Sequence, residues 1–150
     1  MAGKMILNPD LKEFFQLLNE NQVRYLVIGG YAVAFHGYPR YTKDIDIWLY
    51  ADQLNAEKIC QALVGFGFQS LGLQPDDFLE ADTIIQLGQP PNRIDLIIGP
   101  PGVEFEECYT SRVDTTIDGV NIPFIDLDNL IKSKKASGRL QDLADLENLE

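Results

Sequence analysis

The run from Asp44 to Leu49, with the sequence DIDIWL, places two aspartates at alternate positions among apolar residues. This alternation is typical of a β-strand, in which successive side chains point to opposite faces of the sheet. Asp44 and Asp46 are therefore predicted to share one face, while Ile45 and Ile47 point into a core. Two adjacent carboxylates repel each other unless they face solvent, shift their pKa values or bind a cation. A half-exposed strand with a polar face would also produce this short pattern.

A third aspartate lies in a similar apolar run, RIDLIIG, where Asp95 is flanked by Ile94 and Leu96. If this run forms a strand next to the first one, Asp95 can reach the same face as Asp44 and Asp46. Three carboxylates without histidine or cysteine make a site for hard cations such as Mg²⁺ or Mn²⁺. Two such ions are the usual device for in-line transfer at phosphorus. The sequence therefore predicts a metal site at these three acids.

A glycine pair, Gly29 and Gly30, follows the apolar run YLVI and precedes the short helical pattern YAVAFHG. Glycines at the junction of a strand and a helix let backbone N–H groups approach an anion, and the positive end of the helix adds to the attraction. The pair is a candidate phosphate-binding turn. A tight turn that binds nothing would have the same sequence.

Helical and strand patterns alternate along the chain. Hairpins among the strands exclude a purely parallel sheet, so the expected fold class is α/β (α+β), with one domain over residues 1–150 and a mixed β-sheet flanked by helices. Asn8 and Pro9 would start the first helix, Asp126 would cap the last one, and Asp118-Gly119 would form a two-residue hairpin turn. Helices are predicted at 10–21, 31–37, 52–67, 75–81, 103–111 and 127–149, the last with a break at 137–138, and strands at 24–29, 43–50, 68–73, 82–88, 93–99, 113–117 and 120–125.

Composition and charge limit the classes of partner. The chain has 150 residues, 45% of them hydrophobic, and no apolar run long enough for a signal peptide or a membrane span, so a cytoplasmic protein without a membrane partner is expected. A net charge of −11 argues against broad adhesion to nucleic acid or anionic lipid. Cys60 and Cys108 lack histidine or cysteine at metal-ligand spacing and are expected to be small core residues.

Seven of the twelve basic residues lie in three short stretches. Arg40 and Lys43 precede the first acidic strand, Arg93 begins the second one, and four cations lie in the segment IKSKKASGR near the C-terminus. A solvated helix face would account for the last group as well as a binding role would.

The segment VIGGYAVAFHGYPRYTKDIDIWL, followed later by RIDLI, resembles the nucleotidyltransferase superfamily that includes polymerase beta. The superfamily pattern is an apolar residue, Gly, Gly or Ser, about nine to thirteen residues, then two acids separated by an apolar residue, and a later acid between apolar residues. Thirteen residues separate Gly30 from Asp44, which fits. Some members have Ser where this chain has Gly30.

A narrower resemblance links GGYAVAFHGYPRYTKDIDI to small bacterial and archaeal nucleotidyltransferase proteins, some of them related to toxins of abortive-infection and toxin–antitoxin systems. Their C-terminal signature of Lys, Arg and two Asp spaced by three is matched by Lys134, Arg139, Asp142 and Asp145. The resemblance extends from about residue 25 to residue 146.

The resemblance implies a nucleotidyltransferase fold and an enzyme that moves a nucleoside monophosphate from an NTP such as ATP to a hydroxyl. Asp44, Asp46 and Asp95 are then the expected catalytic residues and ligands of Mg²⁺ or Mn²⁺, with two ions expected and Asp95 helping to deprotonate the attacking hydroxyl. The residues expected to bind the NTP are Gly29, Gly30, Arg40, Lys43, Lys134 and Arg139. Lys135 is an alternative to Lys134, because helical spacing places it on one face with Arg139 and Asp142.

Several alternatives stay open at this point. The acceptor can be RNA such as a tRNA end, a protein hydroxyl or a small molecule. The chain can also be a non-catalytic protein with the same fold, such as a toxin component bound to an antitoxin-type protein partner. His36, the only histidine, can be a base or can brace a loop, and Thr42 is expected to brace its loop.

Overall fold

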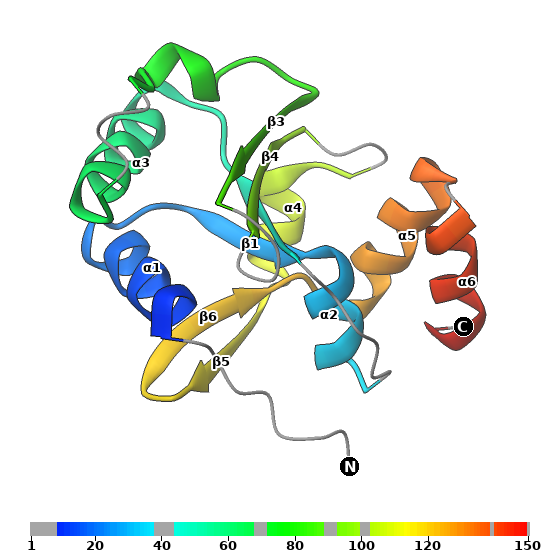
Figure 1. The fold of residues 1–150 in the computed structure, drawn as a ribbon. Coiled ribbons are helices and arrows are strands. Elements are labelled where there is room, and N and C mark those ends of the chain that lie inside the picture. Colours follow the sequence, from blue (N-terminus) through cyan, green and yellow to red (C-terminus); the bar gives the residue numbers. More distant parts are fainter. Residues whose placement is uncertain are drawn as a thin grey trace.

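A six-stranded mixed sheet is the framework of the structure (Figure 1). The computed structural model describes residues 9–37, 44–67, 72–88, 93–99, 103–138 and 140–149. The strand order is β3-β4-β2-β1-β6-β5; β2 pairs with β4 and β1 with β6 in parallel, and the other pairs are antiparallel. The predicted mixed sheet is thus confirmed. The strands are β1 (Tyr25–Ile28), β2 (Asp44–Leu49), β3 (Thr83–Leu87), β4 (Arg93–Ile98), β5 (Val113–Ile117) and β6 (Val120–Phe124).

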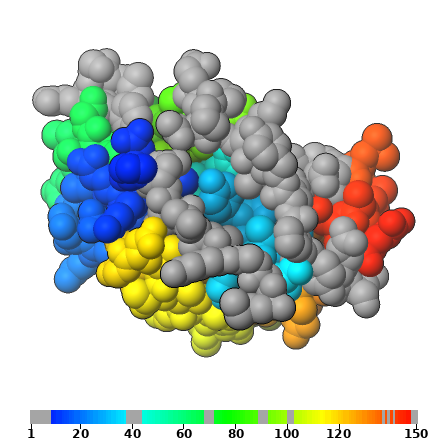
Figure 2. Space-filling view, turned by 60° about the horizontal axis from the view of Figure 1, so that its bottom comes forward, coloured from blue at the N-terminus to red at the C-terminus, as the bar shows by residue number. Residues whose placement is uncertain are grey.

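Helices lie on both sides of this sheet. Figure 1 shows α1 and α3 together on one side and α5 and α6 on the other. Figure 2 shows α1 beside the β5–β6 hairpin, where the side-chain amide of Asn19 donates to the carbonyl of Asn121 at 2.8 Å. The helices are α1 (Pro9–Glu20), α2 (Gly29–Phe35), α3 (Gln53–Gly65), the 3₁₀-helix η2 (Pro75–Phe78), α4 (Phe105–Thr110), α5 (Leu127–Ser137) and α6 (Leu140–Leu149).

The ends of these elements follow the turn and cap residues of the sequence. Asp126 caps α5 by accepting a hydrogen bond from the Asn129 N–H at 3.3 Å, as predicted. Gly138 has a left-handed backbone with φ of 65°, which ends α5 and separates it from α6. Asp118 and Gly119 both have positive φ, 51° and 81°, as a two-residue hairpin turn requires. The strand predicted at 68–73 and the cap predicted at residue 8 lie largely or wholly outside the described residues.

One hydrophobic core holds the sheet against its helices. The alternation in β2 buries Ile45 and Ile47 on one face, opposite the face that carries the aspartates. Trp48 is also buried and packs edge-on against Phe105 of α4, so it belongs to the core. Cys108 is buried and Cys60 half-buried, and both are free thiols. Among the described residues, none of the helices combines the length and apolar character needed to cross a bilayer.

Candidate active site

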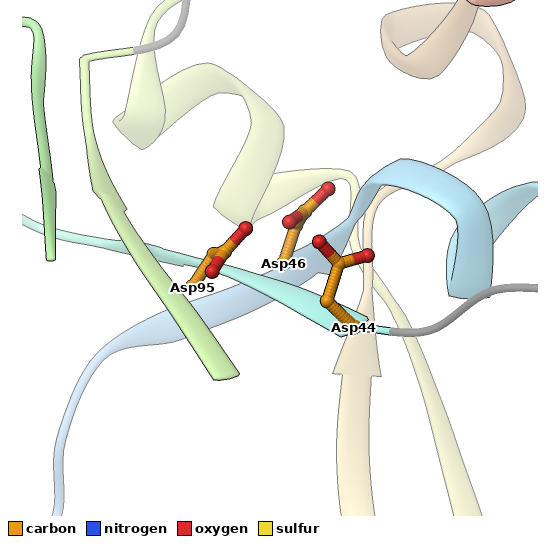
Figure 3. A group of neighbouring side chains, drawn as sticks. All are labelled: Asp44, Asp46 and Asp95. Atoms are coloured by element: carbon orange, nitrogen blue, oxygen red, sulfur yellow. The ribbon is translucent and has the colours of Figure 1, made fainter. Parts of the chain in front are cut away.

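The pairing of β2 with β4 brings the three predicted aspartates together. Asp46 lies directly opposite Asp95 in the parallel register, and Asp44 lies two residues before Asp46 on the same face. Figure 3 shows all three carboxylates pointing into the same space. One oxygen atom from each lies within 4.8 Å of the others. The expectation that Asp95 shares a face with Asp44 and Asp46 is therefore confirmed.

Gly29 brings the backbone directly against this acidic face. It follows Ile28, which is paired with Asp46 in the β1–β2 register, and it begins the seven-residue helix α2. A Cβ atom at Gly29 would lie 2.1 Å from Asp46 Oδ2, and the φ angle of Gly29 is +68°. Both facts require glycine at this position. The Ile28 side chain gives no capping hydrogen bond to the first turn of α2, and Gly30 is buried within that turn.

Arg93 also lies on the acidic face, a position that the sequence analysis did not assign to the site. It faces Asp44 in the β2–β4 register and precedes Asp95 by two residues, so all three side chains are on one side of the sheet. The Arg93 Nη2 atom donates to Asp44 Oδ2, and it donates to Asp95 Oδ2 at 3.2 Å. The alternation in the segment RID was the available signal, because residues two apart in a strand share a face.

The environment of Asp95 differs from that of the other two acids. Its side chain is only 9% exposed. Burial raises the pKa of Asp95 above its ordinary value; the hydrogen bond and charge of Arg93 oppose this shift, and the charge of Asp44 adds to it. Asp95 Oδ1 lies 3.1 Å from Arg93 Nε and forms an ion pair with it, but not a hydrogen bond. Oδ1 therefore has no hydrogen-bond partner among the described residues.

These features fit a hard divalent cation. All donor atoms are carboxylate oxygens, which Mg²⁺ and Mn²⁺ prefer, and they lie within common reach of one ion. A buried carboxylate oxygen without a hydrogen-bond partner is costly unless a ligand satisfies it. Asp95 Oδ1 thus lacks a hydrogen-bond donor within the described structure, and a cation bound to this oxygen would satisfy it.

A cavity of about 400 Å³ opens beside the carboxylates. Ile84 of β3 and Ile97 of β4 are cross-strand partners, and Ile97 lies two residues beyond Asp95; both isoleucines line the cavity and give it an apolar side. Residues of α5 and α6 also line the cavity. The lining residues are Ile28, Gly29, Asp46, Asp82, Ile84, Asp95, Ile97, Ile98, Gly99, Leu130, Ser133, Lys134 and Asp142. The cavity can therefore hold a ligand that is charged at one end and apolar along one side.

Lys134 reaches this cavity from α5 and is 5% exposed. Its ammonium group lies 3.0 Å from both Asp142 Oδ1 and Asp145 Oδ2 of α6. Lys135 is exposed, so Lys134 is the lysine that lies at the cavity. The two ion pairs of Lys134 join α5 to α6.

The structure leaves several predicted binding residues undescribed. Arg40, Lys43 and Arg139 lie outside the described residues, as does Thr42. His36 Nε2 lies 2.8 Å from the carbonyl oxygen of Ile125 and must donate, because a carbonyl only accepts. His36 also packs edge-on against Phe35. It braces the end of α2 against the segment after β6, which agrees with the bracing alternative.

Comparison with protein families agrees with this geometry. A family model described as "Nucleotidyltransferase of unknown function (DUF6036)" matches residues 8–150, nearly the whole chain. No curated protein sequence is significantly similar to the chain.

Solved structures with the same fold include three nucleotidyltransferase-like proteins. A protein from Thermotoga maritima that was assigned as a nucleotidyltransferase matches with a TM-score of 0.60 and 17% identity, over 97% of this chain and 94% of its own. An antigenic nucleotidyltransferase-like protein from Paracoccidioides brasiliensis has a TM-score of 0.58 and 15% identity, over 93% of this chain and 74% of its own. The lincosamide antibiotic adenylyltransferase LnuA, bound to lincomycin, has a TM-score of 0.54 and 18% identity, over 96% of both chains. At these identities the likeness concerns the fold.

Proposed function

The chain belongs to the nucleotidyltransferase family of unknown function that matches residues 8–150, and we propose that it is a divalent-metal-dependent enzyme that transfers a nucleoside monophosphate from an NTP to a hydroxyl group. The observation that carries this proposal is the convergence of the Asp44, Asp46 and Asp95 carboxylates beside Gly29 at the edge of a cavity. In the proposed reaction, the hydroxyl oxygen attacks the α-phosphorus, the bond from the α-phosphorus to the bridging oxygen breaks, and pyrophosphate leaves.

Each residue of the site has a proposed part in this reaction. Divalent ions held by the three aspartates would neutralise phosphate charge and activate the hydroxyl. Asp95 is proposed to accept the hydroxyl proton, because it lies beside the other two carboxylates and lines the cavity. Gly29 and Gly30 would let the backbone of α2 approach the phosphates.

The basic residues that the sequence predicted to bind the NTP are also part of the proposal. Arg40, Lys43 and Arg139 would offset phosphate charge, although each lies outside the described residues. Lys134 is engaged by two carboxylates of α6, so its contribution to NTP binding would be to hold the cavity wall in place as well as to supply charge.

A small molecule is the acceptor that we favour. The net charge of −11 disfavours a large polyanion such as tRNA, which generally binds through many cationic contacts. The cavity has room for a compact ligand and presents the apolar wall of Ile84 and Ile97 next to the carboxylates. LnuA, which has the same fold, is named for transfer of an adenylyl group to lincosamide antibiotics, which are small molecules.

The test is nucleotide transfer with each of the four α-labelled NTPs, Mg²⁺ or Mn²⁺, and separate pools of small metabolites, proteins and RNA. We expect label to appear in the small-molecule pool and to vanish when EDTA replaces the metal. Label in RNA or protein instead would show that the acceptor is not a small molecule, while nucleotidyl transfer itself would be confirmed.

Asp46→Asn is the matched control for the transfer experiment, because it removes the charge of one proposed metal ligand and changes the shape of the side chain little. We expect this variant to lose transfer by at least a hundredfold, while its free energy of unfolding in metal-free buffer stays within about 0.5 kcal/mol of the parent or rises slightly, because one repulsive charge is gone. A clear loss of stability would show instead that Asp46 belongs to a hydrogen-bond network that stabilises the fold. Absence of both metal binding and NTP binding in the parent would favour the non-catalytic alternative.

A further inference from the structure

Arg93 provides the acidic face with a cation of its own. Its guanidinium bridges two of the three carboxylates: Nη2 donates to Asp44 Oδ2 and, at 3.2 Å, to Asp95 Oδ2, while Nε lies 3.1 Å from Asp95 Oδ1. Charge-assisted contacts of this kind to carboxylates are among the strongest polar interactions in proteins. The hydrogen bond to Asp95 is the main reason that the pKa of Arg93 is raised.

The same carboxylate groups are the ones that a divalent ion would use. The carboxylate oxygens of Asp44, Asp46 and Asp95 that could hold a cation all lie within 4.8 Å of one another, and Arg93 contacts two of these three residues. A guanidinium and a divalent ion would therefore be held at the same carboxylates, and their positive charges repel each other. Binding of one must weaken the binding of the other.

The backbone fixes this arrangement, but the end of the side chain can leave. Arg93 is opposite Asp44 in the register of β2 and β4, so its Cα cannot move away without breaking the sheet. Its side chain is 31% exposed, and a long side chain of this kind can move its charged end into solvent or towards an anion by rotations about its own bonds.

We propose that Arg93 is a positioning residue that acts as an internal counter-cation. In the absence of metal it holds Asp44 and Asp95 together against their repulsion, and it lowers the affinity of the site for a metal ion alone. An anionic ligand that attracts the guanidinium frees the carboxylates, so Arg93 couples metal entry to nucleotide binding. This inference rests on the proposed function, because it assumes that the three aspartates bind a divalent ion.

The test measures the dissociation constant of Mn²⁺ alone by titration calorimetry, in the full-length protein without nucleotide. We expect Arg93→Gln to bind Mn²⁺ about tenfold more tightly than the parent, because the competing charge is gone while part of the aliphatic stem and an amide N–H donor remain. Metal-free Arg93→Gln should melt at a lower temperature than the parent, and Mn²⁺ should raise its melting temperature more than that of the parent. Arg93→Lys keeps the charge without the forked geometry and should lie between the two in affinity.

Arg112→Gln is the matched control. Arg112 is also 31% exposed and pairs with Asp114 in β5, so this variant has the same loss of net charge away from the three aspartates. Its affinity for Mn²⁺ should rise by less than twofold. Equal tightening in both variants would show a general charge effect and overturn the inference.

The remaining outcomes separate the inference from the function on which it rests. If the parent binds Mn²⁺ and Arg93→Gln binds it equally or more weakly, Arg93 merely supports the site and the inference is wrong. If neither protein binds Mn²⁺, the proposed metal site itself fails. Should Arg93→Gln not fold without metal, the affinity of Arg93→Lys decides, since a competing role predicts tighter binding than in the parent and a supporting role predicts weaker binding.

Discussion

Gly29 shows how a single residue makes the site possible. Its backbone passes so close to Asp46 that a β-carbon would overlap a carboxylate oxygen, and its φ angle is one that other residues adopt only at a cost. The close approach is what would allow the first N–H groups of α2 to reach a phosphate held beside the aspartates. The glycine pair in the sequence predicted a turn at which the backbone can approach a ligand closely, but it did not predict the contact with Asp46.

We expect Gly29→Ala to destabilise the protein by about 3 kcal/mol, the sum of the left-handed backbone and the overlap with Asp46. Gly138→Ala is a matched control, because Gly138 has nearly the same φ, +65°, with nothing within 4 Å of an added β-carbon. It should cost only about 1–2 kcal/mol. Urea unfolding measures both values, and equal losses would mean that Asp46 can move aside at little cost.

A double variant isolates the overlap from the backbone strain. Asp46→Ala removes the carboxylate that an alanine at position 29 would meet. In the Asp46→Ala background, Gly29→Ala should therefore cost about as much as Gly138→Ala does in the parent. A cost that stays near 3 kcal/mol would assign the loss to strain elsewhere.

At the scale of secondary-structure elements, the helix pair α5 and α6 depends on a buried lysine. The ammonium of Lys134 is enclosed between Asp142 and Asp145, and all three side chains are at most 6% exposed. Burial of charges is expensive, and it is tolerated only while the charges are paired. This pairing sets the position of α6 against α5, and with it one wall of the cavity.

Lys134→Met should destabilise the protein by about 3–5 kcal/mol, since it leaves two buried carboxylates without this partner. Lys135→Met removes a neighbouring charge that is exposed, and it should change stability by no more than about 0.5 kcal/mol. Chemical denaturation checks both values. Combining Lys134→Met with Asp142→Asn and Asp145→Asn should recover most of the loss, and failure to do so would indicate that packing of the lysine stem matters more than its charge.

At the scale of the whole molecule, the acidic excess acts against the compact state. The chain carries 23 acidic and 12 basic residues, and self-repulsion of this excess falls as ions screen it. Raising NaCl from 20 to 300 mM should therefore increase the free energy of unfolding by about 1 kcal/mol. This is the repulsion energy of one pair of like charges about 4 Å apart in water. KCl should act equally, and stabilisation that depends on the cation used would contradict simple screening.

Magnesium separates this general effect from the proposed site. MgCl₂ at matched ionic strength should stabilise the parent further, because an ion that binds only the folded state adds to its stability. The additional gain should disappear in Asp46→Asn, while the response to NaCl remains.

Local patterns in the sequence predicted most elements of this protein. The alternation in DIDIWL and RIDLIIG predicted two strands and the face that each aspartate takes, because side-chain direction in a strand follows from position alone. Asp126, Asp118-Gly119 and Gly138 predicted a helix cap, a hairpin turn and a helix end, because each depends on the conformational preference of a few adjacent residues.

The tertiary structure decided which of these elements meet. Nothing local in the sequence states that Asp95 lies opposite Asp46, that Arg93 bridges Asp44 and Asp95, or that Lys134 rather than Lys135 faces the cavity. These facts depend on the register of β2 against β4 and on the packing of α5 against α6, which join residues far apart in the chain. Such contacts are selected by burial of the whole core, so they emerge only when every element is in place.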